Sequence, residues 1–255
     1  MFLIETNDDS ETTKMQLILD KIAMPSPSPG ISRPRLLGLL DKSLASCTST
    51  VISGRAGTGK TKLAVEFARK CGRSIAWYKV DTPDGELPVF FEYLAGSIQN
   101  QLPDFNRQPL VQLVGRMGPD SISRLAEAFI YQLLQCELKP IVVVIEDLHL
   151  VCDSNWVVPF FHRLLPLLPP EVHMLITSRT MPPAPLWRMR SKQTLSVIDE
   201  DALAFTKGEA LDLFGCYGLT SQQASIALDH THGRAAALDN FAASLCKSEK
   251  TAALA

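Results

Sequence analysis

The sequence predicts a three-layer α/β fold, in which helices cover both faces of a parallel five-stranded sheet. Short apolar runs alternate with helical patterns along most of the chain, as in right-handed strand–helix–strand units. Residues 141–145 are five consecutive β-branched residues, which is typical of a strand buried on both faces. A glycine-rich segment at 54–61 directly follows the apolar run 50–53. Because ligands bind at the carboxyl ends of parallel strands, we expect this segment to form the functional site.

The expected elements follow from hydrophobic periodicity and from turn and cap residues. Strands are predicted over residues 50–53, 74–81, 141–145, 172–177 and 193–198. Helices are predicted over residues 35–46, 59–69, 90–101 and 121–134, the last with Ser121 or Ser123 as its N-cap. Residues 1–30 begin with acidic and polar residues and end in a proline-rich stretch, so we expect a lead-in arm there.

Residues 54–61 have the G-x-x-x-x-G-K-T pattern of a phosphate-binding loop, the Walker A motif. Glycines let the backbone turn tightly enough for successive N–H groups to point at phosphate oxygens, and the following helix directs its positive dipole end at the same anion. We expect Lys60 to reach the β- and γ-phosphates and Thr61 to bind Mg²⁺. The nucleotide-binding candidates are Gly54, Arg55, Ala56, Gly57, Thr58, Gly59, Lys60, Thr61 and the adjoining Lys62.

An acidic pair, Glu146 and Asp147, ends the third predicted strand, where a Walker B motif would lie. One carboxylate of such a pair binds the metal, directly or through water, and the other polarises the attacking water. We assign Glu146 to the metal and Asp147 to the water. The reverse assignment stays open, because glutamate is one methylene longer than the aspartate usually found first.

Arg179 follows the fourth predicted strand. If the third and fourth strands both neighbour the first, Arg179 lies next to the acidic pair and can contact the γ-phosphate. It is therefore our candidate sensor of the γ-phosphate. The predicted catalytic residues are Glu146, Asp147, Lys60 and Arg179, and the predicted metal ligands are Thr61, Glu146 and Asp147.

Composition excludes several classes of function. The net charge of −2 and the pI near 6.2 do not provide the basic surface that nucleic acids require, so we expect no sequence-specific nucleic-acid binding by this chain. Every apolar run is shorter than the roughly 18 to 20 residues of a membrane span, and the N-terminus lacks a signal-peptide pattern. The six cysteines are far apart, which indicates reduced thiols and a cytoplasmic location.

The segments 32–37, 76–78, 146–149 and 175–180, together with the phosphate loop, resemble the nucleotide-binding domain of large ATP-binding LuxR-type regulators. These are maltose-activator-like members of the STAND class, the signal-transduction ATPases with numerous domains. The resemblance covers nearly the whole chain. It implies a P-loop NTPase of the ASCE, AAA+-like type, with ATP or ADP and Mg²⁺ as cofactors.

The resemblance also implies contacts beyond the phosphate loop. The segment before the loop lies against the adenine in that family, which would place Ile31, Arg33 and Arg35 near the base. Residues 233–237 would approach the nucleotide from a small C-terminal lid. Family members usually carry Gly-Trp at the start of this segment, whereas this chain has Gly233-Arg234, so its lid packing is expected to differ.

Three helices are predicted in the lid. A capping box of Thr206 and Glu209 opens the first, Thr220 or Ser221 caps the second, which closes at Gly233, and the third covers residues 234–246. The expected domains are the arm at 1–30, a nucleotide-binding domain at 31–199 and the helical lid at 200–255.

We interpret the chain as an ATP/ADP-binding molecular switch with slow Mg²⁺-dependent hydrolysis, the nucleotide-binding module of a transcriptional regulator in signal transduction. One alternative is a work-performing AAA+-type ATPase that assembles as a ring, and another is a non-hydrolysing nucleotide-binding scaffold. Members of the family continue into a winged helix, a helical-repeat sensor and a helix-turn-helix, and this sequence ends at Ala255 without them. We therefore expect its partner to be either such C-terminal effector domains or another protein.

Overall fold

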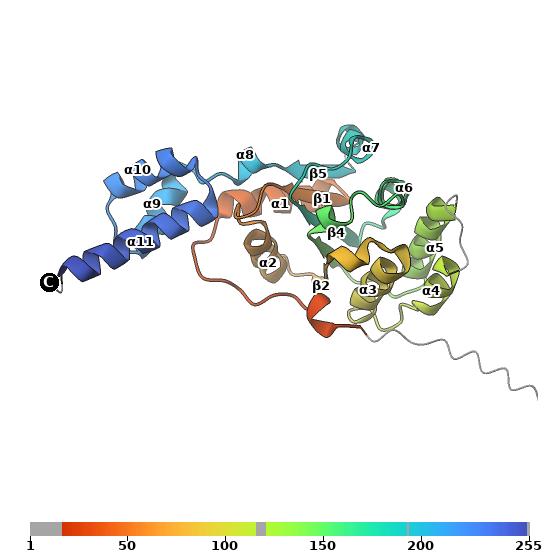
Figure 1. Cartoon of the computed structure of the whole chain (residues 1–255). Helices are drawn as coiled ribbons and strands as arrows, with labels where there is room; N and C mark the ends of the chain where they lie inside the picture. The colour runs from red at the N-terminus through yellow and green to blue at the C-terminus, as the bar shows by residue number, and fades with distance from the viewer. Residues whose placement is uncertain (1–16, 116–120, 193, 254–255) are drawn as a thin grey trace, which may run out of the picture.

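The computed structural model describes residues 17–115, 121–192 and 194–253. Its centre is a sheet of five parallel strands, in the order β2-β3-β4-β1-β5 (Figure 1). The predicted α/β fold with a parallel five-stranded sheet is therefore confirmed. The strands are β1 (Ser49–Ser53), β2 (Ser74–Lys79), β3 (Ile141–Glu146), β4 (Val172–Ser178) and β5 (Leu195–Ile198).

The strand order differs from one expectation. β4 lies between β3 and β1, so the third strand does not neighbour the first. The segment after β4 nevertheless meets the acidic pair, because β3 and β4 pair directly. The predicted second strand ends two residues early, at Lys79, and Gln193 of the predicted fifth strand lies outside the described residues.

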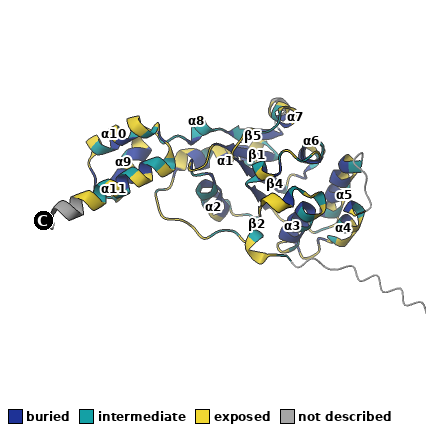
Figure 2. Ribbon diagram, viewed as in Figure 1, coloured by how far each residue is buried: buried dark blue, intermediate teal, exposed yellow. Residues whose placement is uncertain are grey.

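One face of the sheet packs against α1 (Pro34–Ser46) and α2 (Lys60–Lys70). Leucines of α1 and apolar residues of α2 share a buried cluster with Trp77, Val144 and Leu175 of the strands. Pro34 opens α1 at a position where its missing N–H is harmless. The strands β1, β3 and β4 are buried along their whole length, as the run at 141–145 predicts for β3. β2 and β5 also contain half-buried residues, and β5 is partly teal in Figure 2.

The other face is covered by α3 (Leu87–Gln99), α4 (Gln108–Val114), α5 (Ile122–Leu134) and α6 (Val157–Leu164). Phenylalanines from these helices meet edge to face in its core. The short helices α4 and α6 were not predicted from the sequence. Ser121 precedes α5 as predicted, but its side chain makes no capping hydrogen bond.

The C-terminal part is helical. α7 (Ala184–Trp187) and α8 (Glu200–Leu203) are single turns, and α8 still packs with the sheet, because Leu203 belongs to the cluster on the α1 and α2 face. The helices α9 (Lys207–Cys216), α10 (Ser221–Thr231) and α11 (Ala235–Ala253) form their own apolar cluster at one end of the molecule (Figure 1). Capping boxes at Thr206 and Thr220 open α9 and α10, as predicted.

The N-terminal segment runs from β2 and α3 past α2 to the start of α1 (Figure 1). Its 3₁₀ turn η1 (Leu19–Lys21) lies against β2 and α3, where Lys21 Nζ donates to the buried Asp84 carboxylate at 2.5 Å. Residues 22–33 then run to the start of α1 without a helix or strand. Every helix in the part of the chain that the structure describes is too short or too polar to cross a bilayer. The remaining 3₁₀ turns are η2 (Thr82–Gly85), η4 (Leu148–Leu150), η5 (Leu165–Leu167) and η6 (Arg188–Lys192).

Candidate functional site

The phosphate-binding loop connects β1 to α2 at the carboxyl edge of the sheet. Gly57 and Gly59 have φ values of +79° and +89°, a region that side chains other than hydrogen rarely allow. Gly59 is also the N-cap residue of α2. Thr58 Oγ1 donates to Arg55 O at 2.9 Å and closes the turn. The loop therefore has the tight backbone and the helix N-terminus that phosphate binding needs.

Lys60 lies inside this loop. It is 7% exposed, and its Nζ donates to Gly54 O at 2.6 Å and to Arg55 O at 3.0 Å. Burial lowers the pKa of Lys60 and the charge of Arg179 lowers it further, while the charges of Asp147, Glu200 and Glu146 raise it. An anionic phosphate is the kind of ligand that would favour the charged form of this amine.

Thr61 and Glu146 come together across the site. Thr61 Oγ1, in the first turn of α2, donates to Glu146 Oε1 at 2.5 Å, at the end of β3. Hydroxyl and carboxylate oxygens are the ligands that Mg²⁺ prefers, and this pair fits that ion. No cluster of three or more His, Cys, Asp or Glu suited to a metal occurs among the described residues. Mg²⁺ held here would therefore take further oxygens from phosphate and water, as it usually does.

Asp147 has a left-handed backbone, with φ +60° and ψ +37°. Its N–H donates to Thr177 Oγ1 at 3.0 Å, so β4 holds the turn that presents the carboxylate. The His149 Nδ1 lies 3.7 Å from Asp147 Oδ1, and neither ring nitrogen of His149 has a hydrogen-bond partner. Burial lowers the pKa of His149, as do the charges of Arg179 and Lys60, whereas Asp147 raises it. Asp147 thus lies among groups that can orient a water.

Arg179 is exposed just beyond β4. It lines a hollow of about 200 Å³ together with Gly54 of the loop and the acidic residues that follow β5. One of these, Glu200, accepts from Arg55 Nε at 2.7 Å. Arg179 and Gly54 thus border the same hollow at the edge of the loop that holds Lys60. Its role as a sensor remains a prediction.

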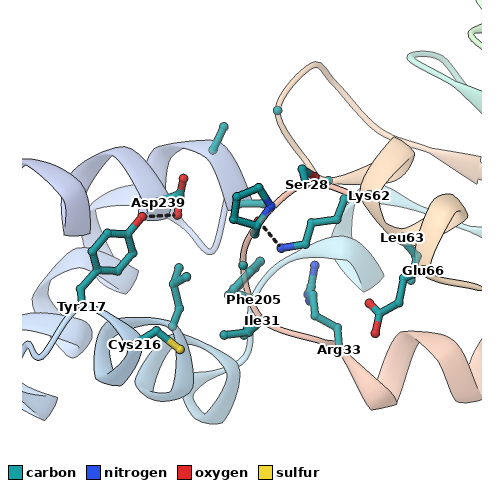
Figure 3. A pocket seen from close by; sticks show the side chains of 17 residues that line it. Ser28, Ile31, Arg33, Lys62, Leu63, Glu66, Phe205, Cys216, Tyr217 and Asp239 are labelled. Atoms are coloured by element: carbon teal, nitrogen blue, oxygen red, sulfur yellow. Dashed lines mark hydrogen bonds between the residues drawn. The ribbon is translucent and has the colours of Figure 1, made fainter. Parts of the chain in front are cut away.

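A pocket of about 590 Å³ opens beside the loop, between the sheet domain and the C-terminal helices (Figure 3). Gly57, Gly59 and Lys62 line its phosphate-loop end. The apolar residues Ile31, Phe205, Leu213 and Tyr217 line the other end, and the polar side chains of Ser28, Arg33, Glu66 and Asp239 also border the pocket. A pocket with an apolar end and an anion-binding end suits a nucleotide.

Arg33 and Arg35 make contacts that the sequence analysis did not foresee. Arg33 lines the pocket, but its guanidinium donates to Leu203 O at 2.9 Å and to Glu209 Oε2 at 2.9 Å, and lies over the Phe205 ring. Arg35 also donates to Glu209 Oε2, at 3.2 Å. Both side chains therefore bind the connection to α9. Contact of either with the base remains a prediction.

The start of α11 touches the phosphate loop. The Arg234 guanidinium donates to Ala56 O at 2.6 Å through Nη2, and Ala236 N donates to Gly57 O at 2.9 Å. A Cβ on Gly57 would lie 2.9 Å from the Ala236 Cβ, so only glycine permits this approach. Segment 233–237 thus contacts the loop, and Arg234, which replaces the usual tryptophan, forms one of the contacts.

Two residues of the site were missed from the sequence. Trp77 Nε1 donates to Glu146 Oε2 at 3.2 Å, and Thr177 supports the Asp147 backbone. No local pattern marks a tryptophan within a strand as a hydrogen-bond donor. Thr177 had a weak signal, because it ends a strand at the edge where the acidic pair lies.

The parallel sheet with a phosphate loop after β1 and an acidic pair after β3 defines a P-loop NTPase. Residues 33–176 match the family model of the AAA ATPase domain, and the chain belongs to this family.

The HTH-type transcriptional regulator MalT of Serratia proteamaculans is 29% identical over 229 residues, which are 87% of this chain and 24% of that protein. MalT of Cronobacter sakazakii is 28% identical over 191 residues, which are 73% of this chain and 20% of that protein. This chain thus spans about a quarter of the length of these regulators. The resemblance to the nucleotide-binding domain of maltose-activator-like STAND regulators is confirmed.

Two solved structures share the fold. A STAND protein with a tetratricopeptide repeat sensor from Pyrococcus horikoshii has a TM-score of 0.52 and 17% identity, over 83% of this chain and 30% of that one. The Walker-type ATPase of Pyrococcus abyssi has a TM-score of 0.51 and 12% identity, over 83% of this chain and 66% of that one. At these identities the likeness concerns the fold.

Proposed function

We propose that this chain is an ATP/ADP-binding molecular switch with slow Mg²⁺-dependent hydrolysis, the nucleotide-binding module of a transcriptional regulator. The observation that carries the proposal is the contact between α11 and the phosphate loop, at Ala56 and Gly57. A nucleotide in the adjoining pocket would touch both the loop and the C-terminal helices. Its phosphates would then change the relative stability of two arrangements of these parts.

We also propose a division of the chain into domains. We infer a nucleotide-binding domain over residues 31–199 and a helical lid over residues 200–255, preceded by the arm. The separate apolar clusters support this division, although Leu203 packs on the side of the sheet. Effector domains of a longer chain, or another protein, would bind differently to the two positions of the lid. We expect this to take place in the cytoplasm.

Each residue of the site has a separate part in the proposed reaction. Lys60 and the loop N–H groups hold the phosphates, and Asp147 polarises the attacking water. Thr61 and Glu146 hold Mg²⁺, which neutralises charge on the phosphates when it is bound. Arg179 stabilises charge on the γ-phosphate. The pocket between Ile31 and Tyr217 would hold the base.

Calorimetry with ATP, ADP and GTP in the presence of Mg²⁺, with turnover measured on the same samples, tests the proposal. The wild type should bind adenine nucleotides selectively and hydrolyse ATP slowly. Lys60→Ala should weaken binding at least about tenfold, because a charged hydrogen bond to phosphate is lost, whereas the exposed Lys42→Ala should not. Asp147→Asn should keep binding and lose turnover.

Other outcomes would favour the alternatives. Rapid turnover that rises with protein concentration indicates an assembling AAA+-type ATPase. Nucleotide binding with no hydrolysis to lose in Asp147→Asn indicates a scaffold. Wild-type affinity of Lys60→Ala would contradict the phosphate-loop assignment itself.

A further inference from the structure

Trp77 is a buried donor to a carboxylate of the site. It lies in β2, where it pairs with Val144 of β3, two residues before Glu146. A residue two positions further along a neighbouring strand is within reach of a long side chain. The Trp77 Nε1 donates to Glu146 Oε2 at 3.2 Å, and the two residues are 1% and 3% exposed.

Glu146 uses its two oxygens for two different partners. Oε1 accepts from Thr61, and Oε2 accepts from Trp77. A buried carboxylate is stable only when donors replace water, and two donors on different oxygens also fix the plane of the group. Both donors are neutral, so neither reduces the charge that the carboxylate presents to a cation.

The indole belongs to the buried apolar cluster that the sheet shares with the helix carrying Thr61. Trp77 belongs to the same buried cluster as Leu63 and Phe67 of α2 and Val144 of β3. Burial in this cluster restricts the indole, and its N–H is one of the two donors that orient the Glu146 carboxylate.

We propose that Trp77 is a positioning residue for the metal site, which orients Glu146 so that one oxygen stays beside Thr61. This inference rests on the proposed function, because it assigns Glu146 to Mg²⁺. It gives the Glu146 carboxylate a fixed orientation at a position where aspartate is the usual residue. It also leaves Asp147 as the carboxylate that faces water.

The test compares Trp77→Phe with Trp156→Phe. Trp156 is also buried and donates its indole N–H, to Gly85 O at 2.8 Å, on the other face of the sheet, so it is a matched control. ADP affinity is measured by calorimetry with Mg²⁺ and with EDTA. Trp77→Phe should reduce the gain in affinity due to Mg²⁺ about tenfold and leave the affinity in EDTA unchanged. Trp156→Phe should change neither.

The proposal is overturned if Mg²⁺ raises the ADP affinity of Trp77→Phe as much as that of the wild type. It is also overturned if the substitution weakens ADP binding equally with Mg²⁺ and with EDTA. Should Trp77→Phe fail to fold, benzothienylalanine at position 77 replaces the N–H by sulfur and keeps the size of the ring. A loss of the Mg²⁺ effect in that variant supports the proposal, and an unchanged effect contradicts it.

A second arm uses Glu146→Asp. If the indole acts through Glu146, then Trp77→Phe added to Glu146→Asp should cause no further loss of the Mg²⁺ effect. Additive losses would contradict the pairing. If the wild-type protein binds no nucleotide, the proposed function itself is wrong. This outcome differs from a failure of the Trp77 proposal, in which the wild type still binds ADP.

Discussion

At the scale of single residues, chemistry at the site depends on which atoms face each other. The sequence identifies Lys60, Thr61, Glu146 and Asp147 by type and spacing, and the structure brings Thr61 within 2.5 Å of Glu146 across 85 positions of sequence. Spacing alone does not show the orientation of Glu146, because Trp77 sets it from a different strand.

Arg179→Ala is predicted to weaken the binding of ATP more than the binding of ADP. The guanidinium lies at the edge of the phosphate loop and acts electrostatically on Lys60, so it can contact a γ-phosphate that ADP lacks. We expect ATP affinity to fall about fivefold to tenfold, because the substitution removes a charged hydrogen bond to phosphate from an exposed guanidinium. Calorimetry with both nucleotides measures the difference.

Arg163→Ala is the control for this change. Arg163 is a surface residue of α6 that pairs with Glu127, on the opposite face of the sheet from α2. It should leave both affinities unchanged. Equal weakening of ATP and ADP by Arg179→Ala would reject the sensor role.

At the scale of elements, a buried polar network joins α1, β1 and β4. His173 of β4 contacts Thr50 Oγ1 of β1 through Nε2 at 2.9 Å and Cys47 O through Nδ1 at 3.1 Å. Ser43 of α1 also contacts Thr50 Oγ1, at 2.5 Å. Burial lowers the pKa of His173 to about 4, partly opposed by its bond to the Cys47 carbonyl. The imidazole therefore stays neutral in the folded protein.

The free energy of unfolding should fall as pH decreases from about 6.5 to about 4 because of His173. In that range the unfolded chain protonates this histidine and the folded chain does not, so the unfolded state binds more protons. Above pH 6.5 the neutral His173 contributes its full share to the free energy of unfolding. About 3 kcal/mol of this contribution is lost by pH 4.

Urea unfolding at pH 7 and pH 5.5 measures this loss. The wild type should lose about 1 kcal/mol more than His173→Gln over that interval. His162→Gln, which removes an exposed imidazole, should behave as the wild type. Identical pH dependence of wild type and His173→Gln would show that the folded protein does protonate His173.

At the scale of the whole molecule, charged contacts connect the C-terminal helices to the start of α1. Glu209 of α9 accepts from both Arg33 and Arg35, which precede the phosphate loop. Burial lowers the pKa of Arg33, opposed by its hydrogen bond and charge interaction with Glu209. Removal of the negative charge would leave two guanidinium groups close together, so this pair of contacts should hold the lid in the arrangement seen here.

Glu209→Gln is predicted to loosen the lid without unfolding the sheet. Hydrogen exchange should increase in α9, α10 and α11, which share their own apolar cluster, and stay at the wild-type level in the five strands. Glu127→Gln, in a surface ion pair, is the control. Unchanged exchange in α9, α10 and α11, or an equal increase in the strands, would show that the contacts of Glu209 with Arg33 and Arg35 do not hold these helices in place.

The sequence by itself determined the class of fold, the five strands and the main residues of the phosphate site. These features are local: β-branched runs make buried strands, a glycine-rich loop needs particular backbone angles, and a carboxylate pair after a strand can only lie at its end. The short helices α4 and α6 were missed, because a few turns carry little periodic signal.

Only the tertiary structure decided which distant residues meet. The insertion of β4 between β3 and β1 brings Thr177 to Asp147, the alignment of β2 with β3 brings Trp77 to Glu146, and the return of α11 brings Arg234 to Ala56 across 178 positions. Such contacts depend on strand order and on the packing of the lid. No local preference of a single segment contains that information, because it is a property of elements that pack together.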